Sequence, residues 1–151
     1  MSRSEQYSWA SLLALTAVFA WFQMRMLDGV SIVDQPARKL LDVYLLTLVA
    51  LVFAETAIAS LLGARTATMD ERDHAIEARA NLNERLFLIA AVNVVIWQAL
   101  MEGAFAGHDL PRIDLGRLPT LFFVLASILF AGEAVKRVST IWLYRVQSAR
   151  G

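Results

Sequence analysis

Four apolar stretches, each about as long as a lipid bilayer is thick, constrain this chain more than any other feature. They run from about 9–27, 40–62, 86–105 and 118–144, and a helix needs about 20 mostly apolar residues to cross the hydrocarbon core. Hydrophobic residues make up 58% of the 151 residues, which is too many for an ordinary soluble domain. The sequence therefore predicts an all-α fold: a four-span transmembrane helical bundle that forms a single domain.

A charged block at 68–85, TMDERDHAIEARANLNER, separates the second stretch from the third. Thr68 and Glu71 have the spacing of a capping box, which starts a helix, and neither glycine nor proline follows before Gly103. We therefore expect one helix that begins at Thr68, extends the third span into the cytoplasm, and ends near Phe105. The side chains expected to dock a partner are Asp70, Glu71, Arg72, Asp73, Glu77 and Arg79.

Basic residues near the span ends predict the orientation. With the N-terminus inside, the inner segments hold nine Lys and Arg residues and the outer loops hold five. This bias favours a cytoplasmic location for both termini and for the charged block. The formal net charge is zero, so composition gives no support for binding nucleic acid. The chain has no cysteine, which excludes disulfides and thiolate metal sites, and no cofactor is expected.

The two halves of the chain share short patterns. MLDG at 26–29 matches LMEG at 100–103, and FAE at 53–55 matches FAGE at 130–133. One interpretation is a tandem repeat of two helical hairpins related by an axis along the membrane normal; the other is chance similarity among apolar residues. The repeat predicts that Glu55 and Glu133 lie at equal depths.

Two segments of the second half, DERDHAIEARA at 70–80 and AGEAVKRVSTIWLYR at 131–145, resemble the motifs of a family of small bacterial membrane proteins without an assigned function. The matching positions are Asp70, Glu71, Arg72, Asp73, Ile76, Ala80, Glu133, Lys136, Tyr144 and Arg145. Two departures are the insertion of Gly132 and a tail that lacks a run of arginines. The resemblance implies a protein of the bacterial inner membrane.

Polar side chains within the spans are the places to look for chemistry, because a charge at the bilayer centre costs at least about 2.5–3.5 kcal/mol. Glu55 has no basic residue three or four positions away, so either another span supplies a cation or donor, or the carboxyl stays protonated. It could serve assembly, or it could carry protons or cations. The intramembrane polar candidates are Glu55, Asn93, Gln98, Glu102, Glu133, Lys136 and Arg137.

The fourth span carries three of these charges close together. Glu133 followed by Arg137 is a favourable ion-pair order on a helix. If the span ends near Tyr144, the three charges lie within the hydrocarbon; if it ends near Val135, they form an interfacial cluster with snorkelling stems.

The third span places Ala91, Gln98 and Glu102 on one face, which should point toward other helices. We expect Glu102 to pair with Arg25, because both lie near the outer ends of their spans.

Two further interpretations concern chemistry. Glu71 and His74 have a spacing that binds metal in carboxylate bundles, but a single copy of this pair is weak evidence for a metal site. The alternative is a solvated acidic face of the helix. No catalytic constellation is visible.

The sequence therefore leaves two functions open. The first is an accessory, assembly or sensory subunit in the lipid bilayer, within a homo-oligomer or a larger membrane complex. The second is a small oligomeric transporter or channel for protons or cations that uses Glu55 and Glu133.

Overall fold

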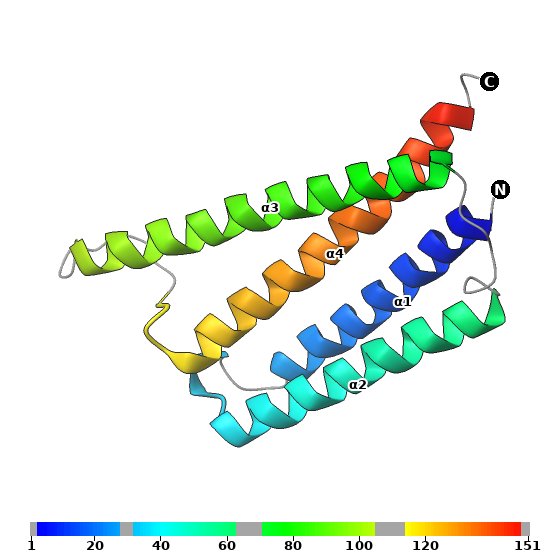
Figure 1. Ribbon diagram of the computed structural model, residues 1–151. Helices are drawn as coiled ribbons and strands as arrows, with labels where there is room; N and C mark the ends of the chain where they lie inside the picture. The colour runs from blue at the N-terminus through cyan, green and yellow to red at the C-terminus, as the bar shows by residue number, and fades with distance from the viewer. Residues whose placement is uncertain (1–2, 28–31, 63–70, 105–113, 149–151) are drawn as a thin grey trace.

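Long α-helices make up nearly all of the structure, a computed structural model that describes residues 3–27, 32–62, 71–104 and 114–148. The helices are α1 (Arg3–Met26), the short 3-10 helix η1 (Ile32–Asp34), α2 (Ala37–Leu61), α3 (Glu71–Ala104) and α4 (Leu118–Ser148), shown in Figure 1. Within these ranges no strand occurs. The all-α prediction is confirmed for the described part of the chain.

Three helices are long and apolar enough to cross a membrane: α2, α3 and the 118–147 part of α4. Helix α1, with 24 residues, is long enough, but its last turns carry Gln23 and Arg25, which lower its hydropathy. The structure therefore supports a membrane protein with at least three spans by length and composition.

The helices alternate in direction, so that the starts of α1 and α3 lie at the same end as the ends of α2 and α4 (Figure 1). Helix α4 is central, because it packs against α3 on one side and against α1 on the other. Helix α2 packs mainly against α1 and contacts α4 only lightly. The order across the bundle is therefore α3, α4, α1 and α2.

An aromatic core joins α1 to α4. Phe22 and Met26 of α1 are almost fully buried, and the ring of Phe130 in α4 lies 5.7 Å from that of Phe22 and 4.9 Å from that of Phe19. The side-chain amide of Gln35 donates to the Met26 carbonyl over 3.1 Å, which satisfies one of the free carbonyls at the end of α1. This core fixes the half of the bundle that contains the end of α1.

Helices α3 and α4 approach closely at Gly132. A Cβ atom at Gly132 would lie 2.7 Å from Cδ2 of Leu88, so the missing side chain makes room for α3. Nearer the end of α4, Ile76 packs in a buried cluster with Leu143 and Tyr144. Gly132, which departs from the pattern of the second motif, thus occupies a close contact between these helices.

Helix α3 is continuous from Glu71 to Ala104, so no turn interrupts it at the charged block. The predicted cap at Thr68, the residue Asp70, and Phe105 lie outside the described residues. Helix α1 begins before the predicted start of the first span, and α4 continues past Tyr144 to Ser148. The tandem repeat stays a prediction.

Candidate functional site: a charged layer across the bundle

Glu55 of α2 faces the other helices and is bound by two of them. The hydroxyls of Tyr7 and Ser11, one turn apart on α1, donate to Oε2 and Oε1 of Glu55. From α4, Nη2 of Arg137 lies 3.3 Å from Oε1. Other helices therefore supply both the donors and the cation that Glu55 lacks nearby on its own helix.

Arg137 is shared between two carboxylates. The same Nη2 atom lies 2.8 Å from Oε1 of Glu133, one turn earlier on α4, and the guanidinium stands 5.4 Å from the ring centre of Tyr7. Because both carboxylates reach one nitrogen, Glu55 and Glu133 lie at the same level of the bundle. The tandem repeat predicts equal depths for these two residues, but this contact does not test the repeat itself.

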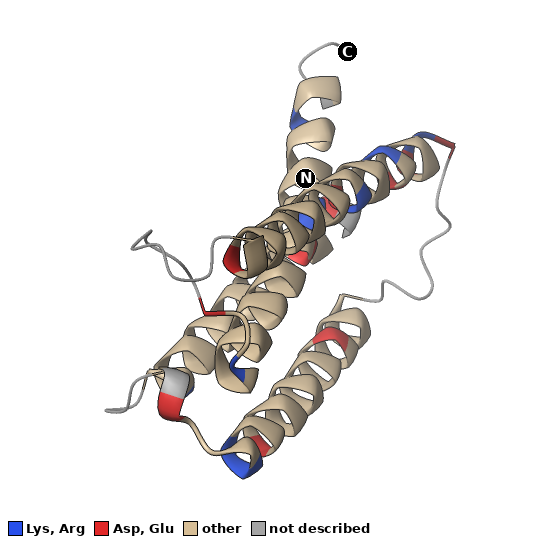
Figure 2. Cartoon of the chain, turned by 90° about the vertical axis from the view of Figure 1, so that its left-hand side faces the viewer, with Lys and Arg blue, Asp and Glu red and all other residues tan. Residues whose placement is uncertain are grey.

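Lys136 turns to the opposite side of α4 and extends the same level to α3, with its Nζ 3.8 Å from Oε2 of Glu84. We call the five residues together the charged layer: Glu55, Glu84, Glu133, Lys136 and Arg137. It holds three carboxylates and two cations, all partly shielded from solvent, with exposed side-chain fractions from 16% for Arg137 to 35% for Glu55. Elsewhere, long stretches of the helices carry no charge (Figure 2).

The polar residues predicted in the third span do not join this layer. Asn93 is exposed and donates to the Ile89 carbonyl of its own helix over 2.8 Å. Gln98 lies with Ala91 on the half-buried stripe of α3. At these positions Asn93 and Gln98 lie outside the charged layer.

Glu102 lies far from the charged layer, at the other end of α3. It accepts the backbone N–H of Leu115 over 3.3 Å, which ties the end of α3 to the segment that precedes α4. Arg25, expected as its partner, places its guanidinium 5.9 Å from the ring centre of Trp21. The backbone contact of Glu102 and the ring contact of Arg25 thus both lie away from the charged layer.

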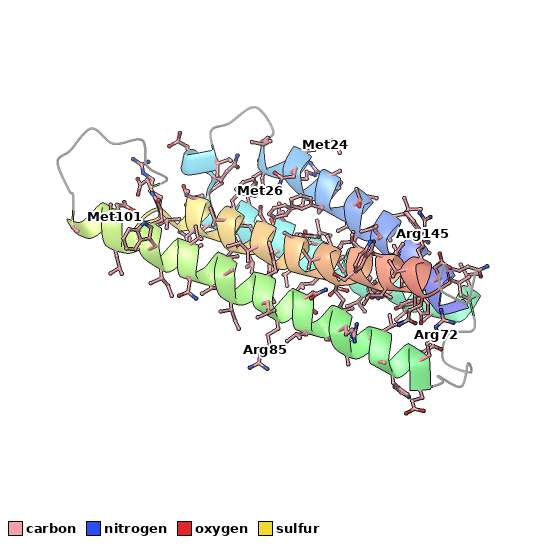
Figure 3. All side chains as sticks on the ribbon, turned by 90° about the horizontal axis from the view of Figure 1, so that it is seen from above. Met24, Met26, Arg72, Arg85, Met101 and Arg145 are labelled. Atoms are coloured by element: carbon pink, nitrogen blue, oxygen red, sulfur yellow. The ribbon has the colours of Figure 1, made fainter. Side chains whose placement is uncertain are left out.

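The charged block has one face bound to α4 and one face free of it. The Tyr144 hydroxyl donates to Oδ1 of Asp73 over 2.5 Å, and Nε of Arg72 donates to Gln147 over 2.8 Å. The exposed residues of the block include Glu71, His74, Glu77 and Arg79. Figure 3 shows Arg72 at the same end of the molecule as Arg145, while Arg85 points away from the bundle.

The weak metal candidates Glu71 and His74 are both exposed. Among the residues that the structure describes, no group of three or more His, Asp or Glu side chains could hold a metal ion. These positions therefore offer an exposed surface rather than an enclosed ligand set.

A cavity of about 320 Å³ lies between α1, α2 and α4 and ends at the charged layer. Its lining residues are Leu15, Phe22, Tyr44, Thr47, Leu48, Leu51, Glu55, Phe122, Ala126, Leu129, Phe130, Glu133 and Arg137. The light contact between α2 and α4 leaves this space. Glu55 and Glu133 thus border an apolar cavity while being paired with Arg137.

Sequence reasoning did not identify Tyr7 and Ser11 as part of this site. The signal in the sequence is the i, i+4 spacing of two hydroxyl side chains, which marks one polar face of α1. Comparison of the chain with family models, curated proteins and solved structures finds no match. Functional assignment therefore rests on the arrangement of the residues themselves.

Proposed function

We propose that this chain is a four-span protein of the bacterial inner membrane, with both termini in the cytoplasm, that acts as a non-enzymatic accessory or sensory subunit. The inclusion of α1 as a span is supported by its packing. Near its end, α1 contributes Phe22 and Met26 to the core, and near its start it binds Glu55. It therefore crosses the same thickness of the bundle as α2 and α4.

The charged layer is best placed at the cytoplasmic boundary of the membrane. Glu84 lies two residues before Leu86, where the apolar stretch starts, and Lys136 of α4 pairs with Glu84. The fourth span would then leave the hydrocarbon near Val135, the interfacial alternative considered above. Its charges need less compensation there than at the bilayer centre.

With that placement, two paired helices extend into the cytoplasm. The 14 residues of α3 from Glu71 to Glu84 are about 20 Å long at 1.5 Å per residue. They run beside the last turns of α4, held by Tyr144 and Asp73. Two packed helices hold an exposed face in a fixed position better than one projecting helix.

The observation that carries the proposal is that both cations of the charged layer are paired within the chain. Such pairing suits helix assembly. Since Arg72 and Asp73 also bind α4, the predicted docking residues that remain are Glu71, Glu77 and Arg79, which are spread around the exposed side of α3. We call these three residues the docking ridge. Large apolar side chains such as Phe53 and Trp97 are exposed on α2 and α3, where lipid or another chain would cover them.

Site-specific photo-crosslinking in native membranes tests this proposal. A photoreactive residue at Glu71 should form a discrete protein adduct, and the substitution Arg79→Glu should abolish it. Arg117→Glu, at the opposite end of the molecule, is the matched control and should leave the adduct unchanged. Loss of the adduct in both variants, or no adduct at Glu71, would count against docking through the ridge.

A second candidate function is an oligomeric transporter or channel for protons or cations. The observation in its favour is that the cavity reaches both Glu55 and Glu133. In proteoliposomes, Glu55→Gln would then abolish a cation or proton flux while the protein stays assembled. An unchanged flux in this variant, or no flux from the wild-type protein, would remove this candidate.

A further inference from the structure

The cavity between α1, α2 and α4 is elongated and has two different ends. At one end the rings of Tyr44 and Phe122 meet edge to face, with 6.2 Å between their centres. At the other end lie Glu55 and Glu133, each eleven positions further along its helix. Eleven residues of helix span about 16 Å, so the cavity has the shape of a short chain with a head.

The body of the cavity is apolar. Its lining between the two ends is formed by Leu15, Phe22, Leu48, Leu51, Ala126, Leu129 and Phe130, with one hydroxyl residue, Thr47. The Thr47 hydroxyl donates to the Val43 carbonyl over 2.7 Å, so its proton is already used. The body therefore favours a hydrocarbon chain over a polar one.

The charged end carries more negative than positive groups. Glu55, Glu133 and Arg137 line it, so two carboxylates face one guanidinium. Lys136 does not correct this imbalance, because it pairs with Glu84 on the other side of α4. With both carboxylates ionised, the cavity ends in one excess negative charge.

The two carboxylates differ in how completely they are bound. Both oxygens of Glu55 accept hydrogen bonds, from Tyr7, Ser11 and Arg137. Among the contacts of the described residues, Glu133 is bound through Oε1, to Arg137. Its Oε2 is therefore the oxygen available to a donor that enters the cavity.

We propose that this cavity binds an amphipathic organic cation, an alkylammonium of modest length. The chain would occupy the apolar body, and the ammonium group would donate to Glu133 and neutralise the excess charge. An anionic amphiphile of the same length would meet two carboxylates, and a neutral one would lack the ionic contact. This binding activity goes beyond the docking role and does not depend on it.

The size of the cavity sets the class of ligand. Its volume of about 320 Å³ lies at the lower end of the range of roughly 300–1,000 Å³ for ligand sites. A single short chain fits this space better than a two-chain lipid. The probe chosen is n-octylammonium, compared with 1-octanol and octanoate, which keep the chain and change only the charge of the head.

Equilibrium dialysis with the purified protein in zwitterionic nanodiscs, corrected with empty nanodiscs, gives the affinities. We expect n-octylammonium to bind at least about tenfold more tightly than 1-octanol, the effect of one hydrogen bond to a charged group, and octanoate to bind most weakly. Equal binding of the amine and the alcohol would reduce the site to a hydrocarbon pocket. Preferred binding of octanoate would make Arg137 the recognition group. Either result overturns the proposal.

Three variants locate the contact. Glu133→Gln should weaken binding of n-octylammonium about tenfold and leave 1-octanol unchanged, and Ala126→Phe should abolish both by filling the cavity. Glu77→Gln is the matched control, because it removes the same charge from an exposed residue of α3 that does not line the cavity, and it should change binding less than twofold. If Glu77→Gln weakens binding as much as Glu133→Gln, general surface charge is responsible and the site is wrong. The comparison of three ligands on the wild-type protein decides the matter even if a variant fails to fold.

Discussion

Oε1 of Glu55 lies 3.3 Å from Nη2 of Arg137, although the two residues are 82 positions apart in the sequence. This contact joins α2 to α4, two helices that otherwise touch only lightly. Because the cavity lies between these two helices, the ion pair closes the charged end of the cavity and fixes the width of the cavity there. The pair therefore matters both for the assembly of the bundle and for the shape of the cavity.

Glu55→Ala should lower the free energy of unfolding by about 1–2 kcal/mol, the size found for bonds between membrane helices in model peptides. Glu55→Gln should cost less, because the amide oxygen still accepts from Tyr7 or Ser11. Unfolding in detergent, followed by circular dichroism, measures both. Asn93→Ala is the control and should behave as wild type, since Asn93 bonds to its own helix. Equal losses for the two Glu55 variants would show that the charge, not the hydrogen bonding, stabilises the bundle.

Arg137→Gln should destabilise the protein more than the loss of either carboxylate, by about 2–3 kcal/mol. Without the cation, Glu55 and Glu133 face each other with like charge. The double variant Arg137→Gln with Glu133→Gln should recover part of this loss, because the repulsion disappears. A double-mutant cycle in the same unfolding assay measures the coupling. Simple additivity of the two changes would contradict the shared-cation arrangement.

Tyr144→Phe removes the hydroxyl that donates to Asp73 and keeps the ring in its buried cluster. We expect a loss of about 1 kcal/mol, confined to the start of α3. Amide hydrogen exchange should therefore become roughly fivefold faster over residues 72–80 and stay unchanged around the cavity. Trp142→Phe, at an exposed position on the same helix, is the matched control. A uniform change over all helices would indicate global rather than local destabilisation.

Gly132→Leu should push α3 away from α4, because the space for a side chain is taken by Leu88. Gly132→Ala should be tolerated, since the nearest atoms belong to the tip of a flexible side chain and alanine favours helix by about 1 kcal/mol. The chain has no native cysteine, so spin labels can be attached specifically at Leu86→Cys and Leu129→Cys. The label separation should grow by roughly 1–2 Å in the leucine variant, within the usual range of helix spacing. An unchanged label separation in the leucine variant would show that a movement of the Leu88 side chain alone accommodates the substitution.

The apolar stretches and the positions of glycine and proline predicted much of the fold. The apolar stretches located the helices, and the absence of glycine and proline between 71 and 102 predicted the uninterrupted helix α3. The isolation of Glu55 on its own helix left two alternatives, a partner from another span or a protonated carboxyl, and in the structure Tyr7, Ser11 and Arg137 of other helices contact it. These inferences depend only on local sequence and on the cost of burying a charge.

The identity of the partners could not be predicted, because it depends on how far one helix slides and turns against the next. Arg137 was expected to pair with Glu133 on its own helix, and it does, but its second contact with Glu55 requires the tertiary register. Gly132 looked like an interruption of a motif, whereas its role as a contact point is visible only with Leu88 beside it. The cavity likewise arises from the light packing of α2 on α4, which no residue pattern encodes.

The order of Glu55 and Arg137 along the sequence has a consequence for synthesis. When α1 and α2 have left the ribosome, Glu55 can already reach Tyr7 and Ser11, but its cation is still 82 residues away. Until α4 is made, Glu55 is therefore held by the hydroxyls of α1 alone. Synthesis of α4 supplies the counter-ion, so the ion pair that joins α2 to α4 can form only after α4 has left the ribosome.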